Sequence, residues 1–119
     1  MEDKLYWYKA ECVRVIDGDT LELKFDLGMN TFRVERVRLS GIDTPEIFGV
    51  KKESIEYARG MEAKQFVLDF VTGKELWVHT EKDKQGKYGR YVVDIYILDE
   101  ALSLCQNLVK VGLAVEKKY

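Results

Sequence analysis

Residues 38–46 read Arg38-Leu39-Ser40-Gly41-Ile42-Asp43-Thr44-Pro45-Glu46, and they combine two carboxylates, one guanidinium and a proline in one short segment. Proline fixes its own φ and keeps the preceding residue out of the helical region, so we expect a stiff, irregular turn. The carboxylates of Asp43 and Glu46 can then converge on one point. Arg38 ends a run of alternating apolar residues, which places it on a strand, a firmer support than a loop. Because an acidic turn after a strand is often only solvated, the meaning of this segment depends on the rest of the chain.

The residues before this segment have the pattern of a hairpin. Odd-numbered positions from 21 to 27 are apolar and alternate with polar residues, which predicts a half-buried strand. Residues 28–30 suit a turn, and residues 31–39 suit the return strand. In that return strand the apolar positions change parity between Val34 and Val37. One extra residue must then be absorbed, and we predict a β-bulge near Glu35 and Arg36.

The other elements follow from composition and spacing. Strands are expected over residues 5–16, 76–80 and 90–98, and helices over residues 57–71 and 100–111. Gly73 and Gly112 follow the two helices as end signals. Residues 47–56 show no period and suggest a mobile loop, while residues 82–89 suggest a polar turn. Five strands with a helix between the third and the fourth predict an α+β, mainly β fold, a five-stranded Greek-key barrel of the OB type with capping helices.

Length and composition set the class of protein. A chain of 119 residues suits one domain, residues 1–119, and 46% hydrophobic with 34% charged residues is typical of a soluble globular protein. No stretch free of charged residues approaches the roughly 20 residues of a membrane span. The N-terminus lacks the features of a signal peptide, which is consistent with a cytoplasmic protein or with a secreted one whose leader was removed. We expect a monomer that does not bind membranes.

The net charge of -2 argues against binding of duplex DNA by bulk electrostatics, which needs a strongly basic face. Cys12 and Cys105 could pair or stay free, and buried free thiols are the simpler interpretation.

The turn Asp17-Gly18-Asp19 has two interpretations. It can be a tight turn in which glycine supplies a positive φ and the aspartates bind nearby amides. It can also be part of a Ca²⁺ site, because that ion prefers six to eight hard oxygen ligands in an adaptable shell. Taken alone, the turn favours the first interpretation. With Asp43 and Thr44 available to complete the shell, the second is favoured.

Arg38, Arg90 and Glu46 also allow a simple interpretation as exposed surface residues. In phosphodiester hydrolysis, negative charge grows on the non-bridging oxygens, and the planar guanidinium offers a matching fork of donors. Two arginines and a cation would form a clamp on that charge. Glu46 would activate an attacking water as its general base, or orient that water.

Three motifs occur here in one order: Ile16-Asp17-Gly18-Asp19-Thr20, then Arg38 five residues before Asp43-Thr44-Pro45-Glu46, then Lys87-Tyr88-Gly89-Arg90. With this order and spacing, the chain resembles the staphylococcal nuclease (thermonuclease-like) family from about residue 12 to about residue 115. The resemblance implies the same OB-type fold.

The resemblance also implies roles for single residues. Asp19, Asp43 and the backbone carbonyl of Thr44 would bind Ca²⁺ directly, with Asp17 behind them, and Glu46 would reach the ion through water. Arg38 and Arg90 would clamp the scissile phosphate. Lys87 and Tyr88 would hold a neighbouring phosphate; their simpler interpretation is a solvated hairpin turn.

The expected function is that of a Ca²⁺-dependent, sugar-non-specific endonuclease, a hydrolase acting on single-stranded or flexible DNA and RNA. The resemblance implies a 5′-oxygen leaving group and 3′-phosphate products. The alternative is a non-catalytic OB-fold module that binds single-stranded nucleic acid or a peptide. After the second helix, the family continues with tyrosines that cover the base and with a third helix. Residues 112–119 read Gly-Leu-Ala-Val-Glu-Lys-Lys-Tyr, so the third helix is expected to be missing.

Overall fold

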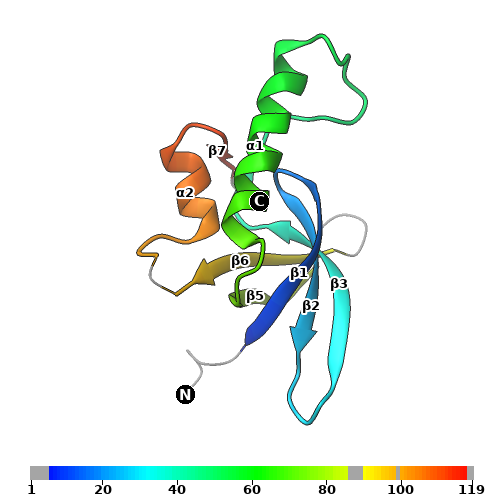
Figure 1. The fold of residues 1–119 in the computed structure, drawn as a ribbon, viewed down its shortest axis with the longest axis vertical. Helices are drawn as coiled ribbons and strands as arrows, with labels where there is room; N and C mark the ends of the chain where they lie inside the picture. The colour runs from blue at the N-terminus through cyan, green and yellow to red at the C-terminus, as the bar shows by residue number, and fades with distance from the viewer. Residues whose placement is uncertain (1–5, 86–89, 99, 118–119) are drawn as a thin grey trace.

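The structure is a computed structural model that describes residues 6–85, 90–98 and 100–117; for residues 82–85 it describes only the backbone. Five strands close into a barrel in the order β1-β2-β3-β6-β5 (Figure 1). They are β1 (Trp7–Asp17), β2 (Thr20–Asp26), β3 (Phe32–Leu39), β5 (Leu76–Gln85) and β6 (Tyr91–Ile97). Neighbouring strands are antiparallel except for β3 and β6, which are parallel. The predicted five-stranded OB-type barrel is confirmed.

Two helices and a small second sheet complete the described fold. They are α1 (Ile55–Val71), α2 (Leu104–Lys110), and the short strands β4 (Ile42–Asp43) and β7 (Val115–Glu116), which pair with each other. The helix predicted over residues 57–71 is confirmed, and it begins two residues earlier because Ser54 caps it by accepting a hydrogen bond from the amide of Tyr57. No helix within the described ranges is long and apolar enough to cross a membrane.

The core lies inside the barrel and continues under both helices. The odd-numbered residues Leu21, Leu23 and Phe25 of β2 are buried, as the alternation predicted, whereas Leu27 lies past the end of β2 and is exposed. They form one cluster with buried residues of α1 and α2, among them Val67 and Leu108. The barrel thus holds β2 and β3 side by side as a rigid support for the residues at their ends.

The bulge predicted near Glu35 and Arg36 is wrong. Strands β2 and β3 pair without interruption from Thr20 opposite Arg38 to Asp26 opposite Phe32. Phe32 and Val34 are more than half exposed. Their even-numbered positions therefore do not show which face of β3 is buried, and the change from even to odd positions does not require a bulge. The register shifts of this sheet lie elsewhere. In the β1–β2 pair they fall between Cys12 and Arg14 and between Val15 and Asp17, and in the β5–β6 pair one falls between Thr80 and Gln85.

Boundaries of other elements also differ from the prediction. The second helix begins at Leu104 rather than near residue 100, because Ser103 and Gln106 form a capping box that fixes its first turn. Strand β5 continues to Gln85, into the segment predicted as a turn. The predicted strand at 90–98 is slightly shorter, as β6 covers Tyr91–Ile97.

The two cysteines are free, as the simpler interpretation held. Cys105 is buried in α2, whereas Cys12 is only partly buried in β1. Burial raises the pKa of both thiols above the ordinary value, which disfavours reactive thiolates.

The segment 47–54 leads from the acidic turn to α1, and Figure 1 shows it and the first turns of α1 extending beyond the barrel. Its anchor is Ile47, which is buried. A Cβ atom on Gly60 of α1 would lie 2.5 Å from Cγ2 of Ile47 and 2.8 Å from the carbonyl oxygen of Pro45. The absence of a side chain at Gly60 therefore allows the turn that carries Glu46 to pack on the helix.

We expect Gly60→Ala to destabilise the protein, although alanine normally stabilises a helix interior by about 1 kcal/mol relative to glycine. The contacts at Gly60 leave no room for a methyl group, and overpacking of this kind costs about 1–3 kcal/mol. Thermal unfolding followed by circular dichroism measures the change. Ala58→Gly, at an exposed position of the same helix, measures the effect of propensity alone. A higher melting temperature for Gly60→Ala would show that the turn is not packed against α1.

Candidate active site

The ends of three strands meet at one edge of the barrel. Arg38, near the end of β3, pairs with Thr20 at the start of β2 and with Val92 near the start of β6. Asp19 directly precedes β2, and its carbonyl oxygen accepts a hydrogen bond from the amide of Leu39 at 2.9 Å. The barrel therefore brings together sequence segments that are far apart along the chain.

Arg38 binds the two aspartates that were predicted as metal ligands. Its Nη2 atom lies 2.6 Å from Oδ1 of Asp43, and its Nη1 atom lies 3.3 Å from Oδ2 of Asp19. Nη1 also donates a hydrogen bond to the carbonyl oxygen of Leu39 at 3.2 Å. The Arg38 side chain is only 11% exposed. The carboxylates of Asp19 and Asp43 thus face one common cation.

Asp19 is held by the residues around it. Its Oδ2 atom accepts a hydrogen bond from the amide of Thr44 at 3.2 Å, and its Oδ1 atom accepts one from Oγ1 of Thr20 at 3.3 Å. Both threonines are buried. The carboxylate therefore has a fixed orientation toward the turn that carries Asp43.

Asp17 lies behind Asp19. Its Oδ1 atom accepts a hydrogen bond from the amide of Asp19 at 3.0 Å, as the turn interpretation predicted. Burial, together with the hydrogen bond and the negative charge of the Asp19 side chain, raises the pKa of Asp17 to about 6. Its own negative charge is thus disfavoured in this site.

Glycine at position 18 was predicted to supply a positive φ for a tight turn. Gly18 does not have a positive φ, so another reason must explain it. A Cβ atom there would lie 2.8 Å from Cβ of Ala63 in α1 and 2.8 Å from Oγ1 of Thr44. Glycine lets the 17–19 turn approach both α1 and the acidic turn, so close packing rather than backbone conformation explains it.

Glu46 lies within the electrostatic field of the same group. Burial raises its pKa first, the negative charges of Asp19 and Asp43 raise it further, and Arg38 opposes them. Glu46 is exposed between the buried residues Thr44 and Ile47. The turn thus presents the Glu46 carboxylate to solvent beside the aspartates.

Arg90 reaches this group through Thr20. Its Nη1 atom donates a hydrogen bond to Oγ1 of Thr20 at 3.1 Å, and the same hydroxyl donates to Asp19. No role was predicted for Thr20, although it is the last residue of the Asp-Gly-Asp-Thr motif. Its hydroxyl connects Arg90 to Asp19.

Two predicted residues and one unpredicted residue remain. Lys87 and Tyr88 lie outside the described residues. Lys117 was not predicted, yet its Nζ atom lies 3.3 Å from Oδ2 of Asp43. No local pattern marks it, because it arrives through the pairing of β7 with β4.

The donor set suits a hard cation. Among the described residues, no three His, Cys, Asp or Glu side chains form a cluster that could hold a metal by themselves. Asp19 and Asp43 nevertheless share one guanidinium, so two carboxylates face the same part of the site. Carboxylate and carbonyl oxygens are the ligands that Ca²⁺ prefers, with water completing the shell. The chemistry of these donors is therefore compatible with a hard divalent cation.

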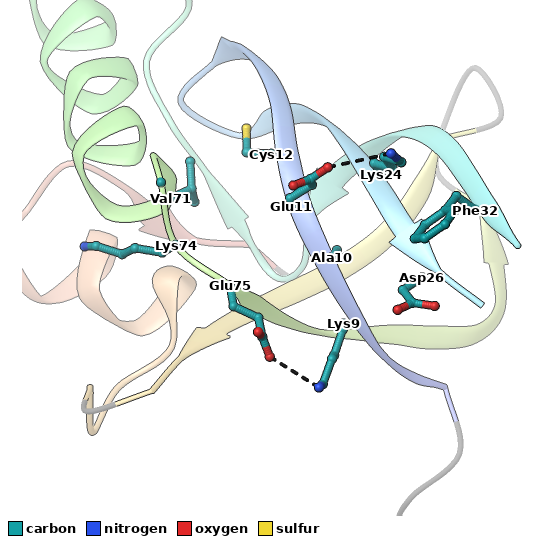
Figure 2. A pocket seen from close by; sticks show the side chains of 11 residues that line it. Lys9, Ala10, Glu11, Cys12, Lys24, Asp26, Phe32, Val71, Lys74 and Glu75 are labelled. Carbon is teal, nitrogen blue, oxygen red and sulfur yellow. Dashed lines mark ion pairs between the residues drawn. The ribbon is translucent and has the colours of Figure 1, made fainter. Parts of the chain in front are cut away.

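A groove of about 580 Å³ lies at a different place, between β1, β2 and the residues that follow α1 (Figure 2). Its charged residues are of both signs, and two ion pairs join Lys9 to Glu75 and Lys24 to Glu11. None of the site residues lines it. Because its charges offset one another, it lacks the basic field that attracts a phosphate backbone.

Comparison with known proteins gives consistent matches. The sequence profile of the family described as "Staphylococcal nuclease homologue" matches residues 36–119. The Thermonuclease of Staphylococcus intermedius is 36% identical over 106 residues, which cover 89% of this chain and 58% of that protein. The Thermonuclease of Staphylococcus hyicus is 31% identical over 107 residues, covering 90% and 58%. An "Uncharacterized endonuclease" of Escherichia coli O157:H7 is 33% identical over 103 residues, covering 86% and 56%.

The protein is thus a small OB-type barrel that carries a cluster of arginine and aspartate side chains at one edge. The chain belongs to the staphylococcal nuclease homologue family. It spans about 58% of the length of the two thermonucleases that it matches.

Proposed function

We propose that this chain is a Ca²⁺-dependent, sugar-non-specific nuclease that hydrolyses phosphodiester bonds of DNA and RNA. The observation that carries the proposal is the binding of Asp19 and Asp43 to one partly buried guanidinium, with Arg90 connected to the same group through Thr20. The names of the relatives, Thermonuclease and Uncharacterized endonuclease, support the same class of reaction.

In this proposal Asp19, Asp43 and the carbonyl of Thr44 hold the calcium ion, and Asp17 supports Asp19 from behind. The bound ion supplies Lewis-acid polarisation of the phosphoryl oxygen. Asp17 keeps the amide of Asp19 in place through its hydrogen bond of 3.0 Å. The carboxylates of the two ligands are oriented before the ion arrives, which lowers the entropic cost of binding.

The remaining residues act on the substrate and on water. Arg38 and Arg90 donate hydrogen bonds to the non-bridging oxygens, where charge grows as water attacks in line with the 5′ oxygen. Glu46 accepts the proton of that water, and partial burial together with the nearby negative charges raises its pKa and thus its basicity. Lys87 and Tyr88 would hold a neighbouring phosphate. The products carry a 3′-phosphate, and single-stranded or flexible substrates fit the site best.

A nuclease assay on single-stranded DNA and RNA with Ca²⁺, with Mg²⁺ and with chelator tests the proposal. We expect cleavage with Ca²⁺ and little with Mg²⁺, because Mg²⁺ demands a tight octahedral shell and releases water slowly. Binding of the oligonucleotide without cleavage in any metal would instead support the alternative, a non-catalytic OB-fold module.

Asp19→Asn is expected to remove most of the stabilisation that Ca²⁺ gives to the wild type. An ion that binds only the folded state adds RT ln(1 + [L]/Kd), about 2.7 kcal/mol at a hundredfold excess over Kd, which raises the melting temperature by several degrees. Thermal melts with chelator and with millimolar Ca²⁺ measure this increment. Glu22→Gln is the control, because it also removes one negative charge, from a residue of β2 that forms an ion pair with Arg14. It should keep the Ca²⁺-dependent rise in melting temperature. Equal increments in the wild type and Asp19→Asn would show that Asp19 is not a ligand.

A further inference from the structure

Asp43 has a cation on each of its two carboxylate oxygens. Nη2 of Arg38 lies 2.6 Å from Oδ1, and Nζ of Lys117 lies 3.3 Å from Oδ2. The two cations differ in their surroundings. Arg38 is 11% exposed and also binds Asp19, whereas the Lys117 side chain is 52% exposed. Lys117 is therefore the cation that can leave Asp43 with less disturbance of the site.

The backbone fixes where Lys117 lies. Strand β7 pairs with β4 so that Val115 is opposite Asp43 and Glu116 is opposite Ile42. The amide of Lys117 then donates a hydrogen bond to the carbonyl oxygen of Gly41 at 2.8 Å. This ladder places Lys117 beside the acidic turn whatever the conformation of its long side chain.

The segment that leads from α2 into β7 is also fixed by contacts with both helices. The amide of Leu113 donates to the carbonyl oxygen of Leu108 in α2 at 2.9 Å, and Ala114 is buried. Nη2 of Arg59 in α1 donates to the carbonyl oxygen of Gly112 at 2.9 Å. Both helices thus fix the segment that delivers Lys117.

We propose that Lys117 is a competing cation for Asp43, and that it sets the concentration at which a divalent ion fills the site. The inference rests on the proposed function, in which Asp43 is a ligand of the ion. The ammonium group of Lys117 at Oδ2 partly neutralises the negative charge of Asp43, which would otherwise attract the ion. When the ion binds Asp43, the Lys117 side chain moves away while its backbone stays in the β7 ladder.

The size of the effect follows from the exposure of the pair. Exposed ion pairs contribute about 0.2–1 kcal/mol, which corresponds to a factor of roughly 1.4 to 5 in a binding constant. We expect Lys117→Met to increase the Ca²⁺ affinity by about that factor. Lys117→Arg keeps the charge and should remain near the wild type.

Isothermal titration calorimetry with CaCl₂ at low ionic strength measures the affinities of the wild type, Lys117→Met and Lys117→Arg. Lys110→Met is the matched control, because it removes the same charge from the exposed end of α2. Melts in chelator establish that each variant is folded. Added salt should reduce the gain of Lys117→Met, since screening weakens an exposed pair.

Equal Ca²⁺ affinities for the wild type and Lys117→Met would overturn this inference, and so would an equal gain in Lys110→Met, which would indicate bulk charge. Neither result would affect the proposed nuclease activity, which the assay on single-stranded DNA measures separately. A wild type that cleaves DNA but binds no Ca²⁺ would overturn the inference together with the choice of ion. A wild type that binds Ca²⁺ but does not cleave would overturn the proposed function alone.

Discussion

Arg38→Ala is expected to lower kcat on single-stranded DNA by about two to three orders of magnitude, the scale for losing one preorganised donor to the charge of the transition state. The Arg38 side chain is partly buried, and its guanidinium is oriented by Asp19, Asp43 and the carbonyl oxygen of Leu39. Such preorganisation means that little rearrangement is needed when charge develops on the phosphate. Binding of the oligonucleotide should change much less than turnover.

The experiment compares single-turnover rates in saturating Ca²⁺ for Arg38→Ala, Arg38→Lys and Arg36→Ala. Arg36 lies on the same strand, two residues earlier, and is exposed beside Glu22, so its replacement controls for charge and for strand stability. Arg38→Lys keeps a charge but loses the fork of donors and should remain strongly impaired. Arg90→Ala should lose turnover to a similar extent. Near wild-type turnover in Arg38→Ala would show that the proposed clamp is wrong.

Glu46→Gln is expected to lower kcat by about two to four orders of magnitude, the usual contribution of a general base. Glutamine keeps the shape of the side chain but cannot accept the proton of water. The rise in the pKa of Glu46, caused by burial and by Asp19 and Asp43, makes the carboxylate a stronger base than an isolated glutamate.

The matched control is Glu62→Gln, which removes an exposed carboxylate farther along α1. It should leave kcat within a small factor of the wild type. Calorimetry with CaCl₂ should show that Glu46→Gln still binds the ion, so that a lost ligand does not explain the loss of rate. A kcat close to the wild type in Glu46→Gln would assign the proton transfer to another group.

Local patterns predicted most of the secondary structure. The alternation at Leu21, Leu23 and Phe25 correctly indicated a buried face, because β2 is a strand of the closed barrel and these side chains lie in its core. The same reasoning gave a bulge in β3 that does not exist. Phe32 and Val34 are apolar but exposed, and sequence alone does not distinguish an apolar residue in the core from one on the surface.

Helix ends were predicted well where one signal dominated. Gly73 follows α1 with a φ of +70°, as an end signal should. The start of α2 was missed although Ser103 and Gln106 form a capping box that is visible in the sequence. The apolar spacing upstream of Ser103 favoured a longer helix, and the cap overrides it because it satisfies amides that would otherwise lack partners.

The acidic turn and the spacing of five residues between Arg38 and Asp43 could be read from the chain, because they depend on local backbone preferences and on residues close along the chain. Three other features emerge only when the chain folds: Asp19 and Asp43 share Arg38, Thr20 connects Arg90 to Asp19, and Gly18 and Gly60 leave room for close packing. The distance of 3.3 Å between Lys117 and Asp43 is a fourth. Closing the barrel and pairing β7 with β4 fix distances between segments up to 74 residues apart, which no local preference encodes.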